Sequence, residues 1–403
     1  MWARQTGMVK ITWPSVMLVL ASMARAQEPA QSTPAVVPAP PPTGTVTGHV
    51  TASDTQRAAR LVRVALLQKL PPANGDDESE SSQRLPIVFG RSGLDGNFVI
   101  TNVPEGDYYV FGEMPGYLQP YKRLEKDEGD DDVSLAKAMA DVPVIHVTAG
   151  RTSTKEITIQ HGAVISGRVV YDDGSPAANL RVNWEPMDGV DLDASDVPAL
   201  LMASGITNFS ITDDRGRFRA VGVAPGKYRL MTHVVAEDEF QWAPGGANVM
   251  ETFSAQDMTV YAPGKFRKSE AQIVEVRGDE EVPDIEIKIA LDSTHTVSGR
   301  ALAKEDNHAP NRSLVMLVDP SGELPERNVR VNGQGVFHFS YVPPGSYELR
   351  IQGRDSVPAV DPRFNQQIWK TAKDYQPVKV NVLVDDQDVK VDDVLVERLK
   401  KKE

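Results

Sequence analysis

Residues 96–108 read GNFVITNVPEGDY, residues 216–228 read GRFRAVGVAPGKY, and residues 335–347 read GVFHFSYVPPGSY. The three segments align without gaps, and each fits the template G-x-F-x4-V-x2-G-x-Y. Successive copies lie 120 and 119 residues apart. Five matched positions at nearly equal spacing indicate an internal repeat, in which one structural unit is used three times.

A second shared element precedes each copy of the template. It reads Val46-x-Gly48-x-Val50, Ile165-x-Gly167-x-Val169 and Val297-x-Gly299-x-Ala301. The distance from its glycine to the first glycine of the template is 48, 49 and 36 residues in the three copies. The third unit is therefore shorter in its middle than the other two.

The template itself predicts a β-hairpin. Gly96, Gly216 and Gly335 stand where a tight turn needs a positive φ, which glycine adopts without penalty. Apolar residues then alternate, as in a half-buried strand, until a turn containing proline and glycine leads into the strand of the tyrosine. A tyrosine at this point is typical of a tyrosine corner, in which its hydroxyl bonds to the upstream backbone.

The rest of each unit also favours strands, and helix is scarce. Further strand candidates lie at residues 61–67, 180–184 and 314–318, and each unit closes with two more, such as residues 144–147 and 156–159 in the first. About seven short strands with turn residues between them predict a β-sandwich. We therefore expect an all-β protein of three tandem Greek-key, transthyretin-like sandwiches, spanning residues 45–160, 161–292 and 293–403.

These repeats resemble the carboxypeptidase regulatory-like domain, a transthyretin-like or prealbumin-like β-sandwich. The opening V-x-G-x-V strand and the G-x-F-x4-V-P-x-G-x-Y segment carry the resemblance, although Pro225 lies one position later in the second copy. Met114 to Tyr117 also resembles the turn that often follows in this family. The resemblance covers residues 45–398. It implies an accessory or surface module with a carbohydrate-binding-like fold, and no family binding residue matches a position here.

The first 44 residues predict an exported chain. Residues 1–26 have a basic start, a short apolar stretch and Ala24-Arg25-Ala26, which fits a signal-peptide cleavage site. An uncleaved anchor is the alternative. Residues 27–44 are rich in proline and alanine and nearly uncharged, which is typical of a semi-rigid linker or of a disordered N-terminus. We expect a secreted, periplasmic or cell-surface protein that is not integral to the membrane after cleavage.

The composition excludes several chemistries. The chain has 403 residues, of which 40% are hydrophobic, and these proportions indicate a globular protein. It has no cysteine, which excludes disulfides, thiolate nucleophiles and cysteine-bound metals. The net charge of −13 becomes −16 without residues 1–26, which carry three basic residues and no acidic one. Such an acidic surface argues against nucleic-acid binding.

The sequence lacks the motifs of common enzymes. It contains no H-E-x-x-H zinc motif, no G-x-S-x-G nucleophile elbow, and neither a P-loop nor a G-x-G-x-x-G segment. The chain therefore resembles the accessory module of the carboxypeptidase regulatory-like family without an accompanying enzyme. We predict a non-enzymatic protein with no cofactor.

One acidic loop is a candidate for calcium. Asp188, Asp191, Asp193 and Asp196 cluster in the second unit, and carboxylate oxygens suit Ca²⁺. The loop does not match the D-x-[DN]-x-[DN]-G pattern. The alternative is a solvated acidic loop that keeps the protein soluble.

Two groups of aromatic residues are candidates for a ligand-binding surface, because the apolar face of a sugar stacks on a flat ring. Trp242 and Tyr261 flank a Gly-Pro-rich stretch of the second unit, whereas Trp369 and Tyr375 lie in an expected loop of the third. Alternatively, these rings cap the sandwich core. Trp184 lies within an alternating strand and is expected in the core.

Together these features predict a non-catalytic structural, spacer or interaction module. Its expected partner is a protein or a polysaccharide at the cell envelope, and exposed edge strands offer a means of recruiting a protein. The alternative function is carbohydrate binding through exposed aromatic loops.

Overall fold

The computed structural model describes residues 42–69, 87–120, 139–187, 209–235, 240–242, 250–252, 257–361 and 366–399. Strands dominate these residues, and the helical turns among them are the short 3-10 helices η2 (Lys268–Glu270) and η3 (Leu291–Ser293). The predicted all-β class is therefore confirmed. Within the described part of the chain, no helix is both long and apolar enough to cross a bilayer.

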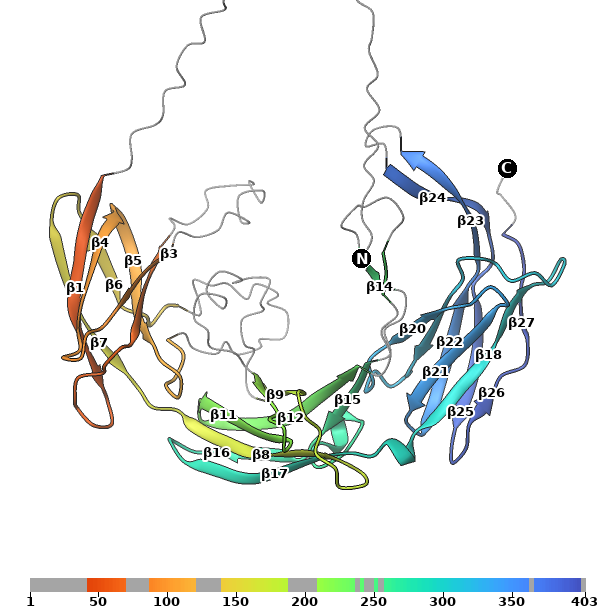
Figure 1. Ribbon diagram of the computed structural model, residues 1–403, viewed down its shortest axis with the longest axis horizontal. Helices are drawn as coiled ribbons and strands as arrows, with labels where there is room; N and C mark the ends of the chain where they lie inside the picture. Colours follow the sequence, from red (N-terminus) through yellow and green to blue (C-terminus); the bar gives the residue numbers. More distant parts are fainter. Residues whose placement is uncertain are drawn as a thin grey trace, which may run out of the picture. The chain divides into compact units, whose positions relative to one another are not determined.

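The strands gather in three successive groups along the chain (Figure 1). The first group contains β1 (Thr43–Ala52), β2 (Arg63–Gln68), β3 (Ile87–Arg91), β4 (Asn97–Pro104), β5 (Gly106–Glu113), β6 (Val144–Val147) and β7 (Thr152–Ile159). The second contains β8 (Ala163–Tyr171), β9 (Arg181–Pro186), β10 (Phe209–Ile211), β11 (Arg217–Val223), β12 (Gly226–Val235), β13 (Phe240–Trp242), β14 (Met250–Thr252), β15 (Asp257–Tyr261), β16 (Ile273–Val276) and β17 (Glu281–Ile289). The third contains β18 (His295–Ala303), β19 (Leu314–Val318), β20 (Arg327–Arg330), β21 (Val336–Val342), β22 (Gly345–Gln352), β23 (Arg354–Asp361), β24 (Gln366–Asp374), β25 (Val378–Val384), β26 (Val389–Lys390) and β27 (Val394–Val396).

Each group has two main sheets whose central strands follow the same order, and the second and third groups each add a separate two-stranded sheet, β13-β14 and β23-β24. In the first group the sheet β4-β1-β7 accompanies the sheet β3-β2-β5-β6, and the other groups repeat this arrangement. The first strand of each group is antiparallel to one neighbour and parallel to the last strand, as in the pairing of β1 with β4 and β7. The two sheets share one apolar core, because buried Val46 and Phe98 of one cluster with buried Tyr108 of the other. Each group is thus a β-sandwich.

The predicted hairpin is wrong, because the two strands of the template belong to different sheets. β4 pairs with β1, whereas β5 pairs with β2 and β6. The proline-glycine turn between them is a corner that carries the chain from one sheet to the other. Corresponding strands of the other two copies are divided in the same way.

A bulge in the template explains its spacing of four residues between phenylalanine and valine. Phe98 and Ile100 are buried on one face by ordinary alternation, but Val103 is three residues further on and is also buried. The intervening Asn102 has φ 58°, and the corresponding Gly222 and Tyr341 have φ 72° and 53°. The register of the ladder shifts at this point in all three copies. The extra residue returns the valine to the core face.

Glycine in the V-x-G-x-V element is required by a close approach of neighbouring strands. A Cβ on Gly48 would lie 1.8 Å from the carbonyl oxygen of Lys155, and one on Gly167 would lie 1.8 Å from that of Ile285. A Cβ on Gly299 would lie 2.6 Å from the ring of Phe337. The glycine therefore admits both the parallel last strand and the phenylalanine of the template.

The predicted tyrosine corner is confirmed in all three copies. The hydroxyl of Tyr108 donates to the carbonyl oxygen of Pro104 at 3.0 Å, and that of Tyr228 donates to the carbonyl oxygen of Ala224 at 2.6 Å. The hydroxyl of Tyr347 donates to the Pro343 carbonyl at 2.7 Å. The bond fixes the corner at which the chain changes sheets.

The predicted signal peptide, residues 1–26, lies outside the described residues, as does most of the predicted linker, residues 27–44. β1 begins at Thr43, so the last two residues assigned to the linker belong to the first sandwich.

Candidate interaction site on the third sandwich

A two-stranded ribbon is inserted into the third sandwich between β22 and β25. Its strands β23 and β24 pair with each other and extend beyond the other strands of this sandwich (Figure 1). Four large apolar side chains of the ribbon are exposed to solvent, with exposed fractions of 49%, 56%, 41% and 47% for Val357, Val360, Ile368 and Trp369. An isolated two-stranded ribbon is only marginally stable in water. Its conformation therefore depends on anchors elsewhere.

The predicted aromatic candidates do not form a common surface. Trp369 is exposed, but Tyr261 and Tyr375 are buried, so neither of these two rings presents a face to a ligand. Trp369 also lies in a strand and not in the expected loop, because the ribbon continues through this segment. Trp242 belongs to β13, and its side chain lies outside the description. Trp184 is buried in the second core, as predicted.

The acidic loop with Asp188, Asp191, Asp193 and Asp196 lies outside the described residues, so the calcium site remains a prediction. Within the described ranges, no group of three or more His, Asp or Glu residues is arranged to hold a metal ion.

A polar cluster anchors the base of the ribbon. The Nε2 atom of His308 lies 3.0 Å from Oδ2 of Asp355, and the hydroxyl of buried Tyr375 donates to the same oxygen at 2.8 Å. The other ring nitrogen of His308 contacts a carboxylate oxygen of Asp306. Asp355 lies at the start of β23, and Tyr375 directly follows β24, so the cluster ties both strands to the turn after β18.

Asn311 completes this anchor. Its backbone N–H donates to Oδ1 of Asp355 at 3.2 Å. Its side-chain amide donates to the carbonyl oxygen of Ser356 at 2.9 Å and accepts from the N–H of Ser356 at 2.9 Å. The amide thus satisfies the backbone of β23 beside the irregularity between Asp355 and Ser356.

The electrostatics of the cluster favour a positively charged imidazole. Hydrogen bonds to Asp306 and Asp355 raise the pKa of His308. Burial acts to raise the pKa of Asp355, but hydrogen bonds from Tyr375 and His308 outweigh it and lower that pKa. Each ring nitrogen faces a carboxylate, which accepts hydrogen bonds. Neither is available to accept a proton from a substrate, so this arrangement suits an anchor and not a general base.

A second contact braces the exposed face of the ribbon. The guanidinium carbon of Arg312 lies 4.8 Å from the centre of the Trp369 ring. The backbone N–H of Arg312 donates to the carbonyl oxygen of Arg354 at 2.9 Å, which places the side chain beside the ribbon. One side of the Trp369 ring is thus held by a cation, while 47% of the residue remains exposed.

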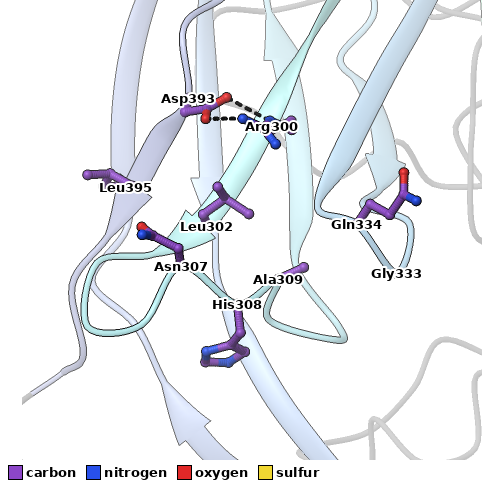
Figure 2. A pocket seen from close by; sticks show the side chains of 9 residues that line it. All are labelled: Arg300, Leu302, Asn307, His308, Ala309, Gly333, Gln334, Asp393 and Leu395. Atoms are coloured by element: carbon purple, nitrogen blue, oxygen red, sulfur yellow. Dashed lines mark hydrogen bonds and ion pairs between the residues drawn. The ribbon is translucent and has the colours of Figure 1, made fainter.

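An open hollow of about 770 Å³ lies next to the polar cluster. Figure 2 shows Arg300 and Asp393 at one end, His308 at the other, and Leu302 between them. Asn307 and Gln334 add amide groups to its lining. The ion pair of Arg300 with Asp393 links the first strand of the sandwich to the segment before its last strand.

The pair of Arg300 and Asp393 has a counterpart in each sandwich. The residue after the glycine of V-x-G-x-V is basic or histidine in all copies, and its partner is acidic. Arg168 contacts Glu286 at 2.7 Å, and His49 lies 3.9 Å from Glu156. Because the pair recurs in every copy, it is a feature of the fold. The second sandwich also carries a short two-stranded ribbon, β13 with β14, so the anchored base of β23 and β24 is the feature described for the third sandwich alone.

Our sequence reasoning missed the anchor. His308, Asp355 and Asn311 belong to no motif, and they are up to 47 residues apart in the chain. The only available signal was the placement of Tyr375 at the end of a segment with no equivalent in the template.

No family model and no curated protein matches the chain. Among solved structures, a streptococcal ancillary pilin is 12% identical, with 89% of this chain and all of that chain covered, at a TM-score of 0.27. The Bacillus anthracis TIE protein is 14% identical at a TM-score of 0.19, with 88% of this chain covered, and the match spans about half (51%) of that protein's length. A putative carbohydrate binding protein from Pseudomonas aeruginosa is 12% identical, covering 30% of this chain and 90% of its own, at a TM-score of 0.18. At these scores, the assignment as a protein of β-sandwiches comes from the sheets and cores described above.

Proposed function

We propose that the protein is a non-catalytic interaction module of the cell envelope, in which consecutive β-sandwiches of the carboxypeptidase regulatory-like type present a ribbon to a partner protein. The export signal predicted at residues 1–26 and the linker predicted after it support the location. The repeated template and its three tyrosine corners support the family. The division into units 45–160, 161–292 and 293–403 is part of the proposal.

The observation that carries this proposal is the anchored ribbon. Its exposed apolar side chains lie on both faces of the ribbon, Val357 and Ile368 on one and Val360 and Trp369 on the other. Exposed apolar surface gathered on one element of a protein is typical of an interaction site. The polar cluster of His308, Asp355 and Tyr375 forms hydrogen bonds that fix the base of the ribbon, and the ribbon holds these side chains away from the sandwich. A rigid presentation of this kind lowers the entropy cost of binding.

Site-specific photocrosslinking in the cells that make the protein tests the proposal. A photoreactive amino acid replaces Val360 in one variant and Val99 in a matched control, which is a similarly exposed valine (62%) on β4 of the first sandwich. We expect a defined cross-linked protein species from position 360 and none from position 99. Equal cross-linking at both positions, or none at either, would contradict the proposal.

A second candidate function is carbohydrate binding, which the exposed ring of Trp369 favours. Arg312 lies over this ring at 4.8 Å and holds it in place, as a sugar platform requires. A glycan array with the wild type and with Trp369→Ala separates the two functions. Binding of a polysaccharide that Trp369→Ala abolishes supports this candidate, and the absence of binding to every glycan removes it.

A further inference from the structure

The outer edge of β24 is an unpaired strand edge. In the described part of the chain, β24 pairs with β23 alone, so residues 366–373 carry no strand on their other side. At about 3.3 Å per residue, the nine residues of β24 present an edge of roughly 30 Å. A long unpaired edge of this kind is a template for pairing with another chain.

Proline distinguishes the two edges of the ribbon. Pro358 of β23 lies opposite Trp369 of β24. Because proline has no N–H, it fits a ladder where its nitrogen faces outward, and the outer edge of β23 then lacks a donor. Pro358 and Trp369 then form a non-hydrogen-bonded antiparallel pair, in which the N–H and C=O groups of each residue point away from the other residue. The N–H and C=O of Trp369, and those two residues away at Gln367 and Thr371, therefore face the free edge of β24.

The C-terminal residues of the described chain already begin a strand on this edge. Arg398 bridges to Tyr375 in the antiparallel sense, and the N–H of Leu399 donates to the carbonyl oxygen of Asp374 at 2.8 Å. If this register continued, Lys400 would face Lys373. Like charges directly opposite each other destabilise a strand pair. The charge of the edge therefore disfavours the chain's own tail and favours an acidic strand.

We propose that the outer edge of β24 accepts an extended segment of another protein as an added antiparallel strand, with a carboxylate opposite Lys370 and an apolar side chain opposite Trp369. This inference rests on the proposed function and names its binding site and the chemistry of its partner. Backbone hydrogen bonds provide the affinity, and Lys370, on a protein of net charge −13, provides the selectivity.

The test uses a synthetic peptide and the full chain. The probe is dye-labelled acetyl-Glu-Val-Thr-Glu-Val-Val-Thr-amide, whose fourth and fifth residues face Lys370 and Trp369 in the proposed register. Binding is followed by fluorescence anisotropy. We expect saturable binding of the unmodified peptide. Methylation of the fifth peptide nitrogen is expected to abolish binding, because its N–H faces β24. Methylation of the fourth nitrogen is expected to leave binding unchanged, because its N–H faces away from β24.

Charge reversal tests the selectivity. Lys370→Glu is expected to weaken binding of the acidic peptide roughly fivefold and to favour a peptide with Lys in place of Glu. Lys227→Glu, an exposed lysine on β12 of the second sandwich, serves as the matched control and is expected to change nothing. Equal effects of the two variants, or equal effects of the two methylations, would overturn the proposal.

Other occupants of the edge give different results. Binding that appears only after deletion of residues 400–403 would assign the edge to the chain's own tail and overturn the proposal. So would a photocrosslink from position 360 to a second copy of this chain. If the crosslink reaches a different protein but the peptide does not bind, the edge proposal fails while the proposed function stands.

Discussion

Replacement of the corner tyrosines by phenylalanine is expected to cost different amounts in different sandwiches. The substitution removes only the hydroxyl. The decrease in the free energy of unfolding therefore measures the loss of the hydrogen bond and the cost of leaving the carbonyl acceptor without a donor. In the third sandwich both Tyr347 and Pro343 are buried, so the carbonyl of Pro343 would lose its partner with no access to water. In the first sandwich Pro104 is only half-buried, and water replaces the lost donor.

The expected magnitudes follow from this difference in burial. A hydrogen bond contributes about 0.5–1.5 kcal/mol net, whereas an unsatisfied buried acceptor costs about 1–3 kcal/mol. We therefore expect Tyr347→Phe to cost about 2–3 kcal/mol and Tyr108→Phe about 1 kcal/mol. Burial also raises the pKa of Tyr347, so its hydroxyl stays protonated and donates throughout the accessible pH range.

Hydrogen exchange with mass spectrometry reads each sandwich separately within the full chain. Tyr347→Phe is expected to speed exchange in β21 and β22 by roughly 30- to 150-fold, and Tyr108→Phe to speed exchange in β4 and β5 by roughly fivefold. A cost for Tyr347→Phe no greater than that for Tyr108→Phe would refute the argument from burial.

Three further predictions follow from the fold and the anchor. Gly167→Ala is expected to destabilise the second sandwich by about 1–3 kcal/mol in urea unfolding, because its Cβ would meet the carbonyl of Ile285; a neutral result would contradict the close approach. Tyr341→Asn is expected to stabilise the third sandwich by about 1 kcal/mol, measured in the same way, because asparagine tolerates φ 53° better than tyrosine. The pKa of His308 is raised in the folded state, so its contribution is fully present below pH 6.5 and is lost as the pH rises through the raised value. Exchange of β23 and β24, corrected for the intrinsic rate, should therefore increase with pH in the wild type and not in His308→Gln.

Much of the sandwich could be predicted from the sequence because its determinants are local and repeated. Residues 314–318 and 144–147 were expected as strands and form β19 and β6 with the same bounds. The tyrosine corner was visible because a tyrosine four residues after a fixed carbonyl can reach it in any copy. The pairing of strands was not visible, since a corner between sheets and a hairpin place proline and glycine at the same positions.

The ribbon and its anchor could not be predicted, because their determinants are neither local nor repeated. Around Trp369 the sequence reads Ile368-Trp369-Lys370-Thr371, so the two neighbouring apolar residues fall on opposite faces of a strand. This pattern fits neither a half-buried strand nor a loop. The anchor depends on the contact of His308, in the turn after β18, with Asp355 in β23. Only the fold brings the turn after β18 to the base of β23.

The parallel pairing of the first and last strands has a mechanical consequence. Because both strands of such a pair run in one direction, the chain enters a sandwich at one end of the ladder and leaves it at the other. Tension along the chain then pulls the two strands past each other and loads all their hydrogen bonds together, whereas a hairpin would open one bond at a time. β1 and β7 resist as an unbroken ladder from Thr45 to Ala52. In the third sandwich the ladder is interrupted between Lys390 and Val394. The ladder of β8 and β17 also shifts its register, between Val282 and Ile285, but it keeps seven pairs against five in the third sandwich. If the chain is pulled from its two ends, we therefore expect the third sandwich to yield first.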